Sequence, residues 1–223
     1  LLNVGVLSVE PQTGLVRAWV GGGDHRFIQY DHVKSRRPVG STFKPIVYTA
    51  ALQSGMMPCE YTPNELRTYD QYKGWQPHNS DGKYGGVYSL AGALSNSVNT
   101  IAVELALRAG VKNVVRLAHD MGISSDIPEV PAIALGAVEA NLLDMVTAYS
   151  TLANRGYRPD RLHYLDRIEN AEGEVLLTFD RPDGNRFKKV LEPGHADMIL
   201  NIMQSVVDLS LIHISEPTRL RRI

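Results

Sequence analysis

The sequence has little cysteine and no excess of charge of either sign. Cys59 is the single cysteine in 223 residues, which excludes an intramolecular disulfide and a cysteine-rich metal site. The formal net charge is -1, from 23 basic and 24 acidic residues, so the chain lacks the electrostatic signature of a nucleic-acid or anionic-membrane partner. The seven histidines are scattered without an H-x-x-x-H pair. We therefore expect neither a metal nor another cofactor.

Long hydrophobic runs are also absent. The chain contains no stretch of about 20 apolar residues and no secretory signal, so we expect no part of it to insert in a membrane. It opens at Leu1 in an apolar run without an initiator methionine, which is typical of a chain entered in the middle of a strand. Any membrane anchor would then lie upstream.

The remaining composition, with 43% hydrophobic and 21% charged residues, is that of an ordinary globular domain. Two β-type runs, Val4–Val9 and Leu15–Val20, flank a turn-rich linker of hairpin length and predict an antiparallel strand pair. A second hairpin is expected from the runs 163–169 and 174–179. The stretch 58–88 shows no sustained period and predicts a long loop.

Helical periodicity begins at Ser41 and ends at Gly55. Further helices are predicted over 90–94, 100–109, 111–122 and 142–156, and from Pro193 onward. Strands first, then a block of helices, then strands again favour an α+β fold, an antiparallel sheet flanked by helices.

The last residues do not fit this domain. Leu209 to Arg219 resembles the conceptual translation of a sequencing adapter, and an ordinary amphipathic tail is the alternative. We expect residues 1–208 to form a partial domain and residues 209–223 to be a non-native tail.

Two Ser-x-x-Lys strings are the first candidates for chemistry. Ser80 and Lys83 fall in a polar, glycine-containing loop without fixed geometry, whereas Ser41 and Lys44 open an amphipathic helix and share one of its faces. Burial and the positive end of the helix dipole would lower the pKa of Lys44, which would then activate Ser41 as a nucleophile. The alternative is an N-capping serine followed by an exposed lysine.

Ser97-Val98-Asn99 is the only Ser-x-Asn in the chain and occupies a polar corner between two predicted helices. At such a corner both side chains can project into a cleft, where the Ser97 hydroxyl relays a proton and the Asn99 amide holds Lys44 and a peptide backbone. A helix cap near Thr100 is the alternative, and it is compatible with catalysis.

The combination of motifs resembles the transpeptidase domain of class A penicillin-binding proteins over nearly all of Val4 to Asp208. The strings that carry the resemblance, in the family's order and spacing, are 40–45, 75–79, 93–100, 134–136 and 148–156. They read Gly-Ser-Thr-Phe-Lys-Pro, Trp-Gln-Pro-His-Asn, Ala-Leu-Ser-Asn-Ser-Val-Asn-Thr, Ala-Leu-Gly and Ala-Tyr-Ser-Thr-Leu-Ala-Asn-Arg-Gly.

The resemblance implies a D,D-transpeptidase that cross-links peptidoglycan. Ser41 would attack the penultimate D-alanine of a stem peptide and pass the acyl group to the amine of a second stem. Lys44 would be the general base, and Ser97 and Asn99 would shuttle the proton and position the substrate. β-Lactams would acylate the same serine. The whole protein would be membrane-anchored at the extracytoplasmic face of the bacterial cytoplasmic membrane, with an upstream glycosyltransferase domain.

The chain departs from the family in one motif. Members carry Lys-Thr-Gly or Lys-Ser-Gly on a strand opposite the serine, and neither string occurs here. We therefore expect a domain truncated before that strand and inactive as it stands, because one of two oxyanion donors is missing. The alternatives are a penicillin-sensing receptor domain, a non-catalytic scaffold, or a serine β-lactamase with Glu139 as its deacylating group.

Overall fold

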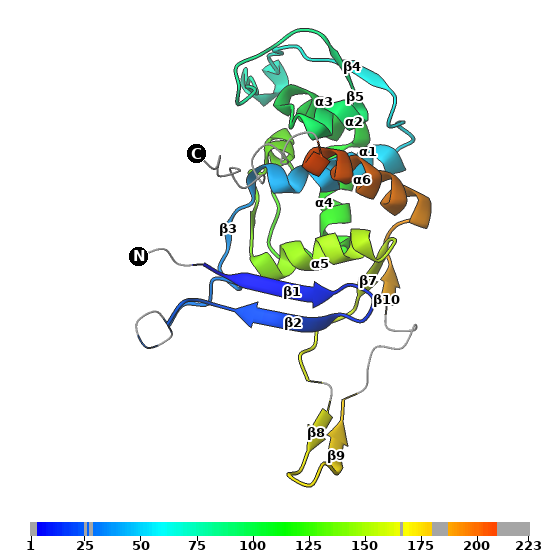
Figure 1. Ribbon diagram of the computed structural model, residues 1–223. Coiled ribbons are helices and arrows are strands. Elements are labelled where there is room, and N and C mark those ends of the chain that lie inside the picture. The colour runs from blue at the N-terminus through cyan, green and yellow to red at the C-terminus, as the bar shows by residue number, and fades with distance from the viewer. Residues whose placement is uncertain (1–3, 25, 27–28, 166, 180–186, 209–223) are drawn as a thin grey trace, which may run out of the picture. The chain divides into compact units, whose positions relative to one another are not determined.

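The computed structural model describes residues 4–24, 26, 29–165, 167–179 and 187–208 (Figure 1). These residues divide into two compact units. The first comprises the described residues within 4–38, 118–126 and 139–196, and the second comprises those within 39–117, 127–138 and 197–208. The expected non-native tail lies outside the described residues.

The first unit contains the predicted N-terminal hairpin. Strands β1 (Val6–Glu10) and β2 (Leu15–Val20) are antiparallel, with Val6 opposite Val20 and Glu10 opposite Leu15. The turn closes through Gly14, whose backbone N–H donates to the Glu10 carbonyl at 2.8 Å. Helix α5 (Leu142–Ala153) packs against β1 (Figure 1).

The other strands of this unit also form antiparallel pairs. They are β3 (Arg37–Pro38) with β6 (Glu139–Ala140), β7 (Tyr157–Pro159) with β10 (Phe187–Lys189), and β8 (Arg167–Glu169) with β9 (Val175–Thr178). The predicted second hairpin is confirmed, although its strands are shorter than the sequence pattern suggests.

The second unit is mainly helical. Its elements are η1 (Gly40–Phe43), α1 (Lys44–Gln53), β4 (Tyr61–Pro63), η2 (Asp70–Tyr72), β5 (Val87–Ser89), α2 (Leu90–Ser95), α3 (Asn99–Ala109) and η3 (Pro131–Leu135). Helices α4 (Val111–Asp120) and α6 (Pro193–Val206) contribute residues to both units. The segment 58–88 is therefore not wholly irregular, since it contains β4 and the start of β5, and the two strands pair.

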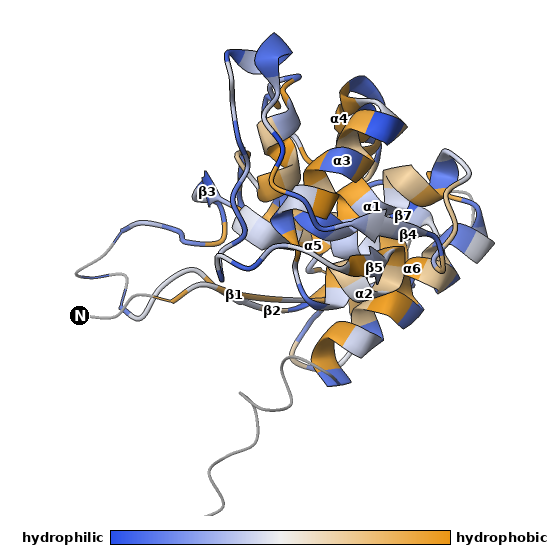
Figure 2. Ribbon diagram, turned by 90° about the horizontal axis from the view of Figure 1, so that it is seen from above, coloured by the Kyte–Doolittle hydropathy of each residue, from blue (hydrophilic) through white to orange (hydrophobic). Residues whose placement is uncertain are grey.

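Helix α1 is the core of the second unit. It packs against α3, and Ile46, Val47 and Tyr48 are completely inaccessible to solvent. Nearly every position of the helix is buried, so it lacks the exposed polar face of an amphipathic helix, and hydrophobic residues recur through the helices drawn around it (Figure 2). A residue on α1 is consequently held with little freedom.

The turn before α1 differs from the predicted single helix. Ser41 lies in the 3₁₀ turn η1, and α1 begins only at Lys44. Pro45 explains the difference, because it lacks the N–H that would donate to the Ser41 carbonyl in an α-helix. The Lys44 N–H donates to that carbonyl instead.

The position of η1 depends on a close backbone approach. Gly136 ends η3 in the left-handed region, with φ 78°, and its carbonyl accepts from the Gly40 N–H at 3.3 Å. The Val39 N–H donates to the Val138 carbonyl at 3.0 Å. A Cβ atom on Gly136 would overlap the Gly40 carbonyl group. Glycine is therefore required at this position both by φ and by space.

The corner between α2 and α3 is a Schellman motif with a serine at its left-handed position. The Ser97 N–H donates to the Leu94 carbonyl and the Val98 N–H to the Ala93 carbonyl, both at 2.9 Å. Ser97 has φ 52°, in a region that glycine usually occupies. The serine at this position therefore carries backbone strain.

We predict that Gly136→Ala destabilises the protein more than Gly74→Ala does. Gly74 has a similar φ of 71° but open space around its Cβ position, so its replacement adds only left-handed strain, about 1–2 kcal/mol. Gly136→Ala adds the overlap with Gly40 to the same strain. Urea unfolding of the two variants makes the comparison, and equal losses would show that the backbone approach is not restrictive.

At the corner, Ser97→Gly should be more stable than Ser97→Ala by about 1 kcal/mol, because only alanine keeps the left-handed strain while both lose the hydroxyl. Asn96 is the matched control, since its φ is -93° and the preference should reverse there. Free energies of unfolding for the four variants test this. The strain argument fails if alanine equals or exceeds glycine at position 97.

Candidate functional site

Four predicted site residues meet within the second unit. Ser41 comes from η1, Lys44 is the first residue of α1, Ser97 lies at the α2–α3 corner and Asn99 is the first residue of α3. Lys44 is 1% exposed, Ser97 and Asn99 are half-buried and Ser41 is exposed. The arrangement thus combines a buried amine with a solvent-accessible hydroxyl.

The hydrogen bonds of Lys44 account for all three protons of its ammonium group. Nζ donates to the Ser97 carbonyl at 2.6 Å, to Ser97 Oγ at 2.8 Å and to Asn99 Oδ1 at 2.6 Å. Ser97 Oγ in turn donates to Ser41 Oγ at 3.2 Å. Ser97 therefore links the amine to the hydroxyl of Ser41.

The capping alternatives for both motifs are wrong. Val39 is the N-cap of η1 and Phe43 that of α1, and neither helix has a side-chain cap. The N-cap of α3 is Val98, so neither Ser97 nor Asn99 is the capping residue of that helix. Lys44 is buried rather than exposed.

Burial lowers the pKa of Lys44 from 10.5 to about 8. Desolvation disfavours the charged form of a lysine, as expected for a side chain surrounded by the apolar residues of α1 and its neighbours. Roughly a tenth of the amine is therefore neutral at pH 7, far more than for an unperturbed lysine. Such an amine can accept a proton from a hydroxyl group within its hydrogen-bond network.

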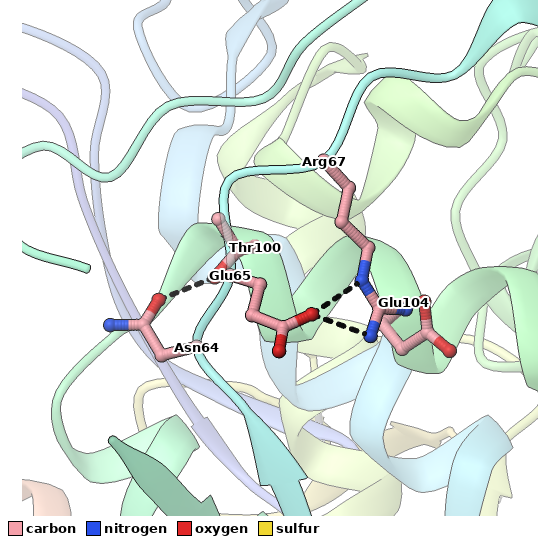
Figure 3. Close-up of polar contacts among 5 residues, drawn as sticks. All are labelled: Asn64, Glu65, Arg67, Thr100 and Glu104. Carbon is pink, nitrogen blue, oxygen red and sulfur yellow. Dashed lines mark hydrogen bonds and ion pairs between the residues drawn. The ribbon is translucent and has the colours of Figure 1, made fainter. Parts of the chain in front are cut away.

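A second polar network lies beside these residues and was not predicted as functional. Asn64, Asn79 and Thr100 are all buried, and Asn64 Oδ1 accepts from Asn79 Nδ2 and from Thr100 Oγ1, both at 2.7 Å. Figure 3 shows the Asn64–Thr100 contact. Sequence periodicity gave no signal for this network, because its members come from a loop, a strand end and a helix.

Arg67 connects the same loop to α3 at the surface. It pairs with Glu65 at 3.0 Å and with Glu104 at 3.1 Å, and all three side chains are at least partly exposed (Figure 3). Exposed ion pairs contribute little stability. The buried amides and the Thr100 hydroxyl are therefore the stronger attachment between the loop and α3.

The second Ser-x-x-Lys string has no comparable geometry. Ser80 and Lys83 are exposed in a turn, where the Lys83 backbone N–H donates to Asp81 Oδ1 at 3.0 Å. As expected, this string lies in a polar loop. Glu139, the residue considered for deacylation, is exposed in β6 opposite Pro38.

The described part of the chain holds no cluster of three or more His, Cys, Asp or Glu side chains that could bind a metal ion. None of its helices combines the length and the apolarity needed to cross a membrane.

The family model for the penicillin-binding protein transpeptidase domain matches residues 4–210. Penicillin-binding protein 1A of Neisseria meningitidis serogroup A is 34% identical over 215 residues, covering 93% of this chain and 27% of the relative. Penicillin-binding protein 2D of Bacillus subtilis is 32% identical over 215 residues, covering 94% and 30%. The chain thus spans less than a third of the length of these relatives.

Solved structures show the same likeness. Penicillin-binding protein 1A from Haemophilus influenzae superposes with a TM-score of 0.84 over 92% of this chain and 35% of that structure, at 22% identity, which speaks for the fold alone. PonA1 from Mycobacterium tuberculosis in complex with penicillin V has a TM-score of 0.77 and 27% identity, over 91% and 55%. The chain therefore belongs to the transpeptidase domain family of class A penicillin-binding proteins, and the penicillin-binding transpeptidase fold expected from its motifs is confirmed.

Proposed function

We propose that the chain acts as a serine D,D-transpeptidase domain, with Ser41 as nucleophile and Lys44 as general base. The observation that carries this proposal is the buried Lys44 amine, bonded to Ser97 and Asn99, with Ser97 bonded to Ser41. Membership of the transpeptidase family supports the same reaction class.

In the first half-reaction, Ser41 Oγ attacks the carbonyl carbon of the penultimate D-alanine of a stem peptide. With Lys44 neutral, both hydroxyl groups turn to donate toward it. The Ser41 proton then passes to Ser97 Oγ while the Ser97 proton passes to Lys44 Nζ, across the contacts of 3.2 Å and 2.8 Å. The C–N bond of the tetrahedral intermediate then breaks, and the departing D-alanine amine takes the proton back from the relay. An ester on Ser41 remains.

In the second half-reaction, the amine of a neighbouring stem attacks this ester. Its proton goes to the relay, the C–O bond to Ser41 breaks, and the proton returns to Ser41 Oγ. Asn99 Oδ1 accepts a hydrogen bond from Lys44 Nζ, and Asn99 Nδ2 donates one to the His78 carbonyl at 2.8 Å. The amide is therefore oriented before a peptide binds. A β-lactam would follow the first half-reaction, with its amide bond in place of the peptide bond.

The chain supplies fewer groups for stabilising the oxyanion than for activating the serine. Ser41 stands in the first turn of η1, where a backbone N–H has no partner within the helix and is available to an oxyanion. The resemblance implies a second donor beside Lys-Thr-Gly, a string that the chain does not contain. We propose that the chain alone is acylated about 100- to 1,000-fold more slowly than one that includes that motif.

Peptidoglycan stem peptides and β-lactams are the proposed ligands. The relative from Mycobacterium tuberculosis was solved with penicillin V, which supports β-lactam binding here. Because this chain covers 27% of the relative from Neisseria meningitidis, the upstream glycosyltransferase domain, the membrane anchor and the extracytoplasmic location of the whole protein are likewise proposals.

We predict that a fluorescent penicillin labels Ser41 covalently and that Ser41→Ala abolishes labelling without unfolding the protein. Ser80→Ala is the matched control, since it removes the serine of the other Ser-x-x-Lys string and should label as the wild type does. Long incubations, with peptide mapping and circular dichroism, make the measurement. Labelling that survives Ser41→Ala would assign the nucleophile elsewhere.

The rate of labelling should depend on pH through Lys44. Because the base must be neutral, the rate should fall about tenfold for each pH unit below the pKa. It should level off above about 8, where Lys44 is deprotonated. Lys44→Arg, which stays protonated, should remove the plateau and nearly all activity. A rate that is constant from pH 6 to 9 would exclude Lys44 as the base.

A further inference from the structure

We infer that Asn79 is a positioning residue of the acylation site, acting on Lys44 through Asn99. The inference rests on the proposed function, because it assigns a task within that reaction. Asn79 precedes α3 by 20 residues and lies in the loop between η2 and β5. Its side chain caps α3 from outside the helix.

Asn79 supplies the capping acceptor that the N-cap residue of α3 does not provide. The first N–H groups of a helix have no partner within it, and the N-cap side chain usually accepts from them. Here the N-cap is Val98, which has no oxygen in its side chain. Asn79 Oδ1 accepts from the Asn99 N–H at 2.9 Å and from the Thr100 N–H at 3.2 Å.

The orientation of the Asn79 amide is fixed by its other atoms. Nδ2 donates to Asn64 Oδ1 at 2.7 Å and to the Lys83 carbonyl at 2.8 Å. Asn64 Oδ1 also accepts from Thr100 Oγ1 at 2.7 Å. A flipped amide would place donor against donor and acceptor against acceptor, at a side chain that is only 8% exposed. Only one orientation satisfies the network.

The residue before Asn79 fixes the other end of Asn99. Asn99 Nδ2 donates to the His78 carbonyl at 2.8 Å, which turns Asn99 Oδ1 toward Lys44 Nζ at 2.6 Å. Residues 78 and 79 therefore hold both the side chain and the backbone N–H of Asn99. Neither contributes a hydrogen bond to Ser41, Lys44 or Ser97, so Asn79 does not take part in the chemistry itself.

The loop that carries Asn79 is itself attached to the second unit by backbone bonds. The Asn64 N–H donates to the Gly86 carbonyl at 3.0 Å, and the Gly85 N–H donates to the Asn64 carbonyl at 2.7 Å. Removing the Asn79 side chain should leave these bonds in place. The expected result is a folded protein whose Asn99 is less well oriented.

The experiment compares single-turnover labelling by a fluorescent penicillin in wild type, Asn79→Ala, Asn79→Asp, Asn99→Ala and the double variant Asn79→Ala/Asn99→Ala. Both the fraction labelled at the end point and the rate constant are measured. Asn79→Ala should label to the same extent but about 10- to 100-fold more slowly, since small displacements of a reacting group have effects of this size.

Two comparisons separate positioning from a purely structural cap. Asn79→Asp keeps a capping oxygen but sets its second carboxylate oxygen against the Asn64 and Lys83 oxygens that Nδ2 contacts, so its rate should fall below that of wild type. If Asn79 acts through Asn99, the double variant should be no slower than Asn99→Ala, within about twofold. If the rate reductions of the two single variants instead multiply in the double variant, Asn79 acts by another route.

Asn141→Ala is the matched control for loss of a cap. Asn141 caps α5 with the same chemistry, accepting from the Asp144 N–H at 2.7 Å, and belongs to the first unit. It should lower the melting temperature by a few degrees, about as much as Asn79→Ala, and leave the rate constant unchanged. The inference is overturned if Asn79→Ala lowers only the fraction labelled and keeps the wild-type rate constant.

A second measurement distinguishes failure of this inference from failure of the proposed function. If wild type is not labelled at Ser41, the proposed function fails, and the ¹⁵N resonance of the Lys44 side chain then tests the positioning alone. Asn79→Ala should shift that resonance, because the contact with Asn99 changes, and Asn141→Ala should not. An unchanged resonance in Asn79→Ala contradicts the inference whatever the labelling shows.

Discussion

The surroundings of Lys44 are governed by the cost of taking an ammonium group out of water. A buried amine needs acceptors in place of its hydration shell, and here Ser97 and Asn99 supply three within 2.8 Å. Not every buried polar group of α1 is supplied in this way. Tyr48, one turn further along α1, is fully buried, its hydroxyl has no partner among the described residues, and burial raises its pKa. The burial of Lys44 therefore depends on the α2–α3 corner, which supplies the acceptors for its ammonium group.

Much of this arrangement could be predicted from the sequence because it follows local rules. Alternating apolar runs around a turn gave the β1–β2 hairpin, and helical periodicity gave α1, α3 and α5 with limits close to those observed. One turn of helix was expected to bring Ser41 close to Lys44, and in the structure Ser97 lies between them and bonds to both. The polar corner between two predicted helices pointed to Ser97 and Asn99, and the resemblance to a family made their association with Ser41 and Lys44 specific.

The parts that could not be predicted depend on contacts without a sequence period. Asn79 caps a helix that begins 20 residues later, so no capping pattern precedes α3. The left-handed backbone of Ser97 was hidden because glycine is the usual signal for a Schellman motif. In the sequence, Gly136 is only part of a string shared with the family. The structure shows why glycine is needed there: the backbone of Gly40 lies against the α-carbon of Gly136.

The distances along the chain between the paired groups have a consequence for biosynthesis. Lys44 and its acceptors are separated by 53 and 55 residues, and Ser41 and Ser97 by 56. Contacts of this range form late, after the intervening segments have been made and folded. Under the proposed function, a chain in which residues 41–44 have not yet met residues 97–99 lacks the hydrogen-bond relay and has a hydrated, protonated Lys44. Reactivity would then depend on folding as well as on sequence.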